Sequence, residues 1–195
     1  MKNKIIWVDL DEILAELADY ILEYNNYTIW DNKITKEEIL DYYLYRIPHL
    51  NITKEFAISW FMKPMLEDIK TYKVLPTIGS LERLKLLKDN GNRLIIITAR
   101  REDIFWEYTK NWLEMHFTNI FDDIVFTDHF SEKHRHKGEV CRELWVECMI
   151  EDNYDYALDL AESGIKTYVL EKPWNKNREE KHENIIKINN WDEFI

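Results

Sequence analysis

Short, uninterrupted apolar runs divide this sequence, and most of them stop at a polar or acidic residue. Residues 4–8 lead into Asp9, and residues 94–97 lead into Thr98. Runs of this length are typical of strands that are buried on both faces of a parallel sheet. We therefore expect a sheet of five or six parallel strands. The remaining runs are residues 124–126, 148–150, 167–170 and the shorter 185–188.

Helical patterns separate these runs, at residues 81–87, 105–113 and 156–161. The first pattern stops near Asn90 and Gly91, and the third stops before Gly164, where glycine suits the position just after a helix. Strands that alternate with helices indicate an α/β fold with helices flanking the sheet.

The segment 12–77 interrupts this alternation. A capping box at Thr35 to Glu38 precedes apolar positions at residues 39–44, and Thr53 precedes a second helical pattern through Trp60. We expect a small, mostly helical cap at 12–77, inserted into a core of residues 1–11 and 78–195. The cap is rich in aromatic residues, and one or two of them are candidates for stacking on a nucleobase.

The net charge of the chain disfavours two classes of binding partner. The chain has 195 residues and a formal net charge of −11, which disfavours binding to nucleic acid polymers and to anionic membranes. No apolar stretch approaches the ~20 residues of a membrane-spanning helix. The two cysteines, Cys141 and Cys148, lie in apolar segments, which is typical of buried free thiols. We expect a soluble cytoplasmic protein, and leave open whether it forms a homodimer.

The residues just after the strands are the most informative, because ligands of open parallel sheets bind beyond the carboxyl ends of the strands. Acids, one hydroxyl and basic groups gather there. Lys137 opens the helix before the run 148–150. The residues that follow the strands are Asp9, Asp11, Thr98, Arg100, Glu151, Asp152 and Asp155.

These residue types suit phosphoryl transfer. One carboxylate can attack phosphorus, and a second carboxyl group two residues on can exchange protons with the leaving group and with water. Carboxylate oxygens and a substrate phosphate are the ligands that Mg²⁺ prefers. Thr98 and Lys137 can hold phosphate oxygens and stabilise the charge of the transition state.

The order and placement of these residues resemble the four motifs of the haloacid dehalogenase (HAD) superfamily. Asp9-Leu10-Asp11 resembles the first motif, residues 95–100 (IIITAR) the second, Lys137 the third, and Glu151-Asp152 followed by Asp155 the fourth. The segments 22–27, 137–144 and 149–153, with Gly164-Ile-Lys and Pro173-Trp-Asn175, look like the 5′(3′)-deoxyribonucleotidase branch and its bacterial relatives.

The resemblance implies a Rossmann-like core, a cap after the first motif, Mg²⁺, and removal of phosphate from a nucleotide or a similar small monoester. It implies that Asp9 is the nucleophile and a metal ligand. Asp11 would be the acid/base and would also bind the metal through its backbone carbonyl. The remaining implied roles are substrate binding by Thr98, Ala99, Arg100 and Lys137, and metal binding by Glu151 and Asp152.

Some positions depart from the family pattern. Glu12 and Ile13 stand where such families often have Gly and Thr or Val, and Glu151 replaces the first Asp of the acidic pair. Glu12 could weaken phosphate binding or point into solvent. Because the side chain of Glu is longer than that of the usual Asp, we expect Asp152 rather than Glu151 to bind the metal directly.

Several alternatives stay open from the sequence. Lys133 competes with Lys137 for the position of the third motif. Arg100 and Arg101 could be structural or solvated, or either of them could touch the substrate. Asp155 could orient the site or only cap the next helix. A zinc site at His129, His134 and His136 is less favoured than a polar loop, because the spacing fits no standard finger.

Three other functions compete with a nucleotidase: a phosphatase for another ester such as a sugar phosphate, a catalytically silent binding module, and a CheY-like receiver. Asp11 and the long insertion at 12–77 argue against a receiver.

Overall fold

A parallel sheet of six strands forms the centre of the molecule. The computed structural model describes residues 1–30, 32–67, 73–129 and 132–194. The strand order is β5-β4-β1-β6-β7-β8, and every neighbouring pair is parallel. The predicted α/β class and all six predicted strands are confirmed. The strands are β1 (Ile5–Val8), β4 (Arg93–Thr98), β5 (Asp123–Phe126), β6 (Cys148–Glu151), β7 (Lys166–Leu170) and β8 (Ile185–Ile188).

Helices cover both faces of the sheet, because alternate side chains of each strand point to opposite faces. Ile6 and Val8 of β1 belong to a core cluster with residues of α3 and α4, whereas Trp7 packs with residues of α5 and α6. The apolar runs are continuous for this reason. The helices are α3 (Ser80–Asp89), α4 (Glu102–His116), α5 (Lys137–Glu143) and α6 (Tyr154–Glu162).

Strand β1 is the point at which the strand order changes direction. It pairs with β4 on one side and with β6 on the other. Immediately after β1, the backbone N–H of Asp9 donates to the carbonyl of Ile150 at 3.1 Å. The carboxyl ends of β1, β4 and β6 therefore meet at a topological switch point, which is where open α/β sheets bind their ligands.

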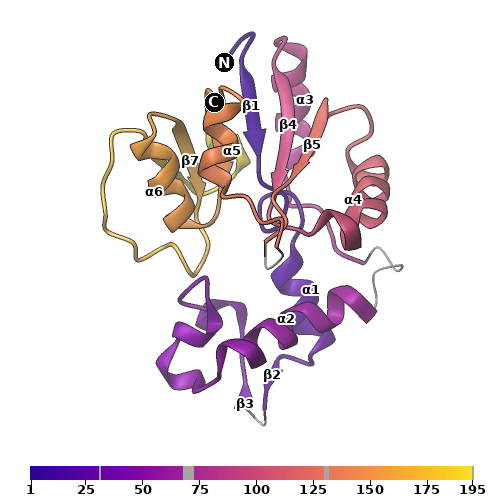
Figure 1. Ribbon diagram of the computed structural model, residues 1–195, viewed down its shortest axis with the longest axis vertical. Coiled ribbons are helices and arrows are strands. Elements are labelled where there is room, and N and C mark those ends of the chain that lie inside the picture. The colour runs from indigo at the N-terminus through magenta and orange to yellow at the C-terminus, as the bar shows by residue number, and fades with distance from the viewer. Residues whose placement is uncertain (31, 68–72, 130–131, 195) are drawn as a thin grey trace.

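The segment 12–77 lies beyond these carboxyl ends, at the opposite end of the molecule from both termini (Figure 1). Its two connections to the rest of the chain run side by side. The N–H of Glu16 donates to Leu75 O at 2.9 Å, and the N–H of Thr77 donates to Leu14 O at 2.8 Å. The segment contains α1 (Leu17–Tyr24), β2 (Thr28–Ile29), β3 (Asn32–Lys33), α2 (Lys54–Glu67) and three short 3₁₀ turns (Lys36–Glu38, Leu44–Arg46, Pro48–Leu50).

One predicted helix of this segment is wrong. The capping box forms, with the N–H of Thr35 donating to Glu38 Oε2 at 2.8 Å, but it opens only the 3₁₀ turn Lys36–Glu38 and no α-helix. The Asp41 carboxylate accepts the N–H of Tyr43, and such local bonds compete with a helix. The following aromatic residues also favour a helix weakly. The helix predicted after Thr53 is confirmed as α2.

Two other sequence expectations can be compared with the structure. Cys141 and Cys148 are both free and buried, and burial raises the pKa of each thiol to about 12. Within the described ranges, no helix combines the length and apolar character that crossing a membrane requires.

The sheet core gives a direct test of the fold. Ile96, in the middle of β4, is fully buried, whereas Ile78 is 94% exposed. Ile96→Ala should lower the free energy of unfolding by roughly 2–5 kcal/mol, because it removes buried methyl groups and leaves a cavity. Ile78→Ala should change it by less than about 0.5 kcal/mol. Urea unfolding followed by circular dichroism measures both, and equal effects would contradict this arrangement of the core.

Candidate active site

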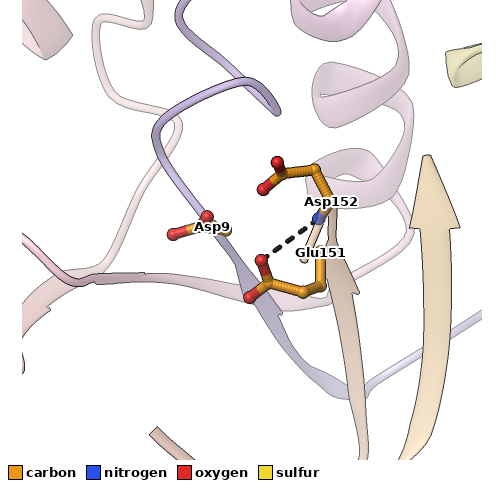
Figure 2. Close-up of side chains that lie close together, drawn as sticks. All are labelled: Asp9, Glu151 and Asp152. Carbon is orange, nitrogen blue, oxygen red and sulfur yellow. Dashed lines mark hydrogen bonds between the residues drawn. The ribbon is translucent and has the colours of Figure 1, made fainter. Parts of the chain in front are cut away.

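Three buried carboxylates meet at the switch point. Asp9 directly follows β1, Glu151 is the last residue of β6, and Asp152 is the next residue. Each of the three offers a carboxylate oxygen that lies within 4.8 Å of those of the others. Figure 2 shows the three side chains facing one another across a small space. Such a cluster is costly to bury unless positive charge accompanies it.

Lys137 supplies one positive charge. It is the first residue of α5, and its Nζ lies 2.8 Å from Asp9 Oδ1 and 2.9 Å from Glu151 Oε2. The side chain is buried, and the negative charges of Asp9 and Glu151 outweigh its desolvation and raise the pKa of Lys137. Lys133, the competing lysine, is exposed. The structure thus brings Lys137 into the cluster.

The two acids of the pair after β6 differ in what they bind. Glu151 uses Oε2 for Lys137, while its Oε1 accepts the backbone N–H groups of Asp152 and Asn153 at 3.1 and 3.0 Å (Figure 2). Asp152 instead uses Oδ2 to accept the indole N–H of Trp174 at 2.8 Å. Glu151 is therefore held by three donors within the protein, which leaves Asp152 better placed to bind a cation directly.

The charge balance of the cluster fits a divalent cation. Among the residues that the structure describes, three carboxylates lie near one ammonium group, that of Lys137. Burial, followed by the charge of Glu151, raises the pKa of Asp9 to about 8, although Lys137 opposes this shift. Burial and the charges of Glu151 and Asp9 raise the pKa of Asp152 as well. Carboxylate oxygens suit a hard cation such as Mg²⁺, whose charge would favour the ionised form of each acid.

Asp11 lies apart from the three buried acids and binds Arg100. The guanidinium donates from Nε to Asp11 Oδ2 at 3.0 Å and from Nη2 to Asp11 Oδ1 at 2.6 Å. Arg100 is buried and also donates to Thr109 Oγ1 at 3.0 Å. The Asp11 side chain is 25% exposed, in contrast to 7% for Asp9. Asp11 is thus the more exposed of the two acids of the first motif, and both of its carboxylate oxygens accept from Arg100.

Thr98 and Ala99 border the same edge. Thr98 is fully buried at the end of β4, and its Oγ1 accepts the N–H of Arg100 at 3.2 Å. Its carbonyl accepts both the N–H and the hydroxyl of Thr127. The carbonyl of Ala99 accepts the N–H of His129 at 3.0 Å. These bonds tie the turn after β4 to the residues that follow β5.

Comparison with known proteins places this arrangement in a known fold. No family model matches the chain. Three solved structures superpose on it with TM-scores of 0.63, 0.59 and 0.56. They are a predicted phosphoglycolate phosphatase from Haemophilus somnus (15% identity; 98% of this chain and 96% of that one), CbbY from Rhodobacter sphaeroides in complex with phosphate (16%; 98% and 96%) and a HAD-superfamily hydrolase from Ehrlichia chaffeensis (15%; 98% and 94%).

The chain has the HAD fold. A protein from Clostridium acetobutylicum that is named a nucleotidase is 28% identical over 196 residues, which cover 99% of this chain and 92% of that protein. The resemblance predicted from four short motifs therefore extends along the whole chain.

Glu12 follows neither of the two expectations. Its φ of +65° lies in the left-handed region, which glycine adopts more readily than other residues. Instead of facing phosphate or solvent, the buried carboxylate accepts the N–H of Ala18 in the first turn of α1. It also lies 3.3 Å from the ammonium of Lys36 and 3.6 Å from that of Lys172. Glu12 thus joins the start of the segment 12–77 to the loop after β7.

Two further expectations concern the loops around the site. Asp155 does not cap α6, because the Asn153 side chain accepts the N–H groups of Asp155 and Tyr156. Asp155 pairs with Arg178 at 2.8 Å and lies 3.6 Å from Arg46 of the segment 12–77. A run of Glu-Asp-Asn before a helical pattern is the signal that could have identified Asn153 as the cap.

The three histidines of residues 129–136 make different contacts. His129 Nδ1 lies 3.1 Å from His134 Nε2, so one ring donates a hydrogen bond to the other. His136 instead faces Asp159 at 3.4 Å. The three histidines therefore do not converge, and the group of three or more candidate ligands found in the described residues is the carboxylate cluster.

Replacing Lys137 tests the charge balance. Lys137→Met should leave three buried acids without their cation and lower the free energy of unfolding by about 3–5 kcal/mol in metal-free buffer. Lys4→Met is the matched control, because Lys4 pairs with Glu147 at the surface, with side chains that are 48% and 42% exposed. The control should cost less than about 1 kcal/mol. Equal losses in urea unfolding would show that Lys137 is not the counter-charge.

His129 predicts a pH dependence. Burial, and next the charges of His134 and Lys137, lower the pKa of His129 from 6.5 to about 4. Between these pH values the unfolded chain binds a proton that the folded protein does not, so stability falls as the pH drops through this window. His129→Gln should make the free energy of unfolding less dependent on pH between 4 and 6.5 than it is in the unmodified chain. Identical slopes would rule out a neutral, partly buried imidazole at His129.

Proposed function

We propose that this chain is a magnesium-dependent phosphomonoester hydrolase that acts on a small substrate, with a nucleoside or deoxynucleoside monophosphate favoured. The observation that carries the proposal is the buried cluster of Asp9, Glu151, Asp152 and Lys137 at the switch point of a HAD fold. The relative named a nucleotidase supports both hydrolysis and the nucleotide preference.

Asp9 and Asp152 would hold Mg²⁺ through carboxylate oxygens, together with the backbone carbonyl of Asp11. Glu151 would complete the acidic shell, chiefly through its bond to Lys137. When bound, the cation supplies positive charge that offsets the repulsion between the anionic Asp9 and an anionic phosphate.

Asp9 would attack phosphorus and form an aspartyl-phosphate, while the bond from phosphorus to the ester oxygen breaks. Asp11 would give its proton to that leaving oxygen. It would then take a proton from the water that attacks phospho-Asp9, which releases inorganic phosphate and restores both acids. Arg100 holds Asp11 in place by two hydrogen bonds.

Thr98, Ala99, Arg100 and Lys137 would line the phosphate site. Thr98 can donate its hydroxyl proton to a phosphate oxygen. Lys137, which pairs with Asp9, can also stabilise the negative charge on the phosphoryl group. Arg100 would contribute mainly through Asp11, since its guanidinium is buried against that residue and Thr109.

The segment 12–77 would act as a cap on a core of residues 1–11 and 78–195, and would select the part of the substrate beyond the phosphate. Tyr42 is the aromatic residue of the cap that we assign to this task. Burial, and next the negative charges of Asp152 and Asp9, raise the pKa of Tyr42, while 40% of the residue stays exposed. A partly exposed ring beside the phosphate site can contact a sugar or a base.

Substitution of the two aspartates of the first motif tests the chemistry. Asp9→Asn should abolish release of p-nitrophenol from p-nitrophenyl phosphate with Mg²⁺, because the amide is not a nucleophile. Asp11→Asn should lower kcat by about 100-fold or more, the usual contribution of acid/base catalysis. Asp89→Asn, at the exposed end of α3, is the control and should keep full activity. Turnover by the Asp9→Asn variant would show that Asp9 is not the nucleophile.

A phosphate-release screen tests the substrate. Nucleoside monophosphates should give a higher kcat/KM than sugar phosphates and phosphoglycolate, and chelation of the metal should stop release. A preference for a sugar phosphate would support the proposed hydrolase activity but contradict the proposed nucleotide substrate. Binding of nucleotide without release, at saturating Mg²⁺, would favour a silent binding module.

A further inference from the structure

The loop after β7 holds one of the candidate metal ligands. Trp174 is buried, and its indole Nε1–H donates to Asp152 Oδ2 at 2.8 Å. The side-chain amide of the next residue, Asn175, donates to the backbone carbonyls of Asp152 and Leu170, each at 2.8 Å. Asp152 is therefore fixed at both its side chain and its backbone by two consecutive residues.

The same loop is itself anchored. The Asn175 Oδ1 accepts the N–H of Lys172 at 3.0 Å, and the ammonium of Lys172 lies 3.6 Å from Glu12 and 3.5 Å from Glu16. The loop that carries Trp174 is thus held on both sides of this residue, by the ion pairs of Lys172 and by the hydrogen bonds of Asn175. A donor held in this way restricts the orientation of the carboxylate that it meets.

The hydrogen bond separates the two oxygens of Asp152. A buried indole N–H needs an acceptor, and here the acceptor is a carboxylate that belongs to the group of candidate metal ligands. Because Oδ2 accepts from Trp174, Oδ1 is the oxygen of Asp152 that this bond leaves available for another ligand. Figure 2 shows the Asp152 side chain close to those of Asp9 and Glu151. Core packing alone would need only the ring of Trp174 and not its N–H group.

We propose that Trp174 is a positioning residue of the metal site, whose indole N–H holds Asp152 Oδ2 and thereby presents Oδ1 to the divalent cation. The inference rests on the proposed function only in taking Asp152 as a cation ligand. It adds a role for the loop at residues 171–175.

Trp174→Phe removes the N–H donor and keeps an aromatic ring in the same place. The dissociation constant for Mg²⁺, measured by isothermal titration calorimetry without substrate, should rise about 10–100-fold. Trp112→Phe is the matched control. Its indole also donates from a buried position at 2.8 Å, but to the carbonyl of Val74, and the variant should bind Mg²⁺ as the unmodified protein does. Unchanged Mg²⁺ affinity in folded Trp174→Phe overturns the proposal.

A second measurement needs no substitution. Each of the eight tryptophans contributes one indole N–H group that a nitrogen-15 NMR spectrum can detect. Titration with Mg²⁺ should shift the signal of Trp174, because its acceptor gains a bound cation, and should leave that of Trp112 unchanged. A Trp174 signal that stays in place at saturating Mg²⁺ also overturns the proposal. Both readouts report binding of Mg²⁺ and not catalysis. A chain whose Mg²⁺ affinity depends on Trp174 but that releases no phosphate would therefore refute the proposed function alone.

Discussion

Burial of three acids around one ammonium group is the constraint on which the rest of this site depends. Removing a carboxylate from water is costly, and Asp9, Glu151 and Asp152 are all buried within a few ångströms of one another. Lys137 offsets part of this cost. The remaining negative charge is of the kind that a divalent cation bound by carboxylate oxygens can offset.

The fold creates this cluster by placing strand ends side by side. Asp9 and Glu151 come from neighbouring parallel strands, so their carboxylates meet although 142 positions separate them in sequence. A second set of contacts orients the acids, because Arg100 donates hydrogen bonds to Asp11 and Trp174 donates one to Asp152. Glu12 contributes differently, because it bonds to Ala18 and lies near Lys172, and so links the segment 12–77 to the loop after β7.

Much of the core was predictable because its signals are local. A strand buried on both faces requires a continuous apolar run, and the residue after each run marks the edge where ligands bind. Prediction was weaker in the segment 12–77, where a capping box at Thr35 indicated a helix that Asp41 interrupts through a side-chain bond. The contacts of Arg100, Glu12 and Trp174 were not predictable either. They join residues far apart in the chain, and no spacing rule encodes the direction of a side chain.

The central claim is that Asp9 and Asp152 share one divalent cation, and a crystal structure grown with Mn²⁺ tests it most directly. The account predicts a single anomalous peak between these two carboxylates, bonded to an oxygen of each at about 2.0–2.3 Å. It also predicts that Lys137 keeps its bond to Glu151. A peak at another place, or an occupied phosphate site with no cation between Asp9 and Asp152, would contradict the account.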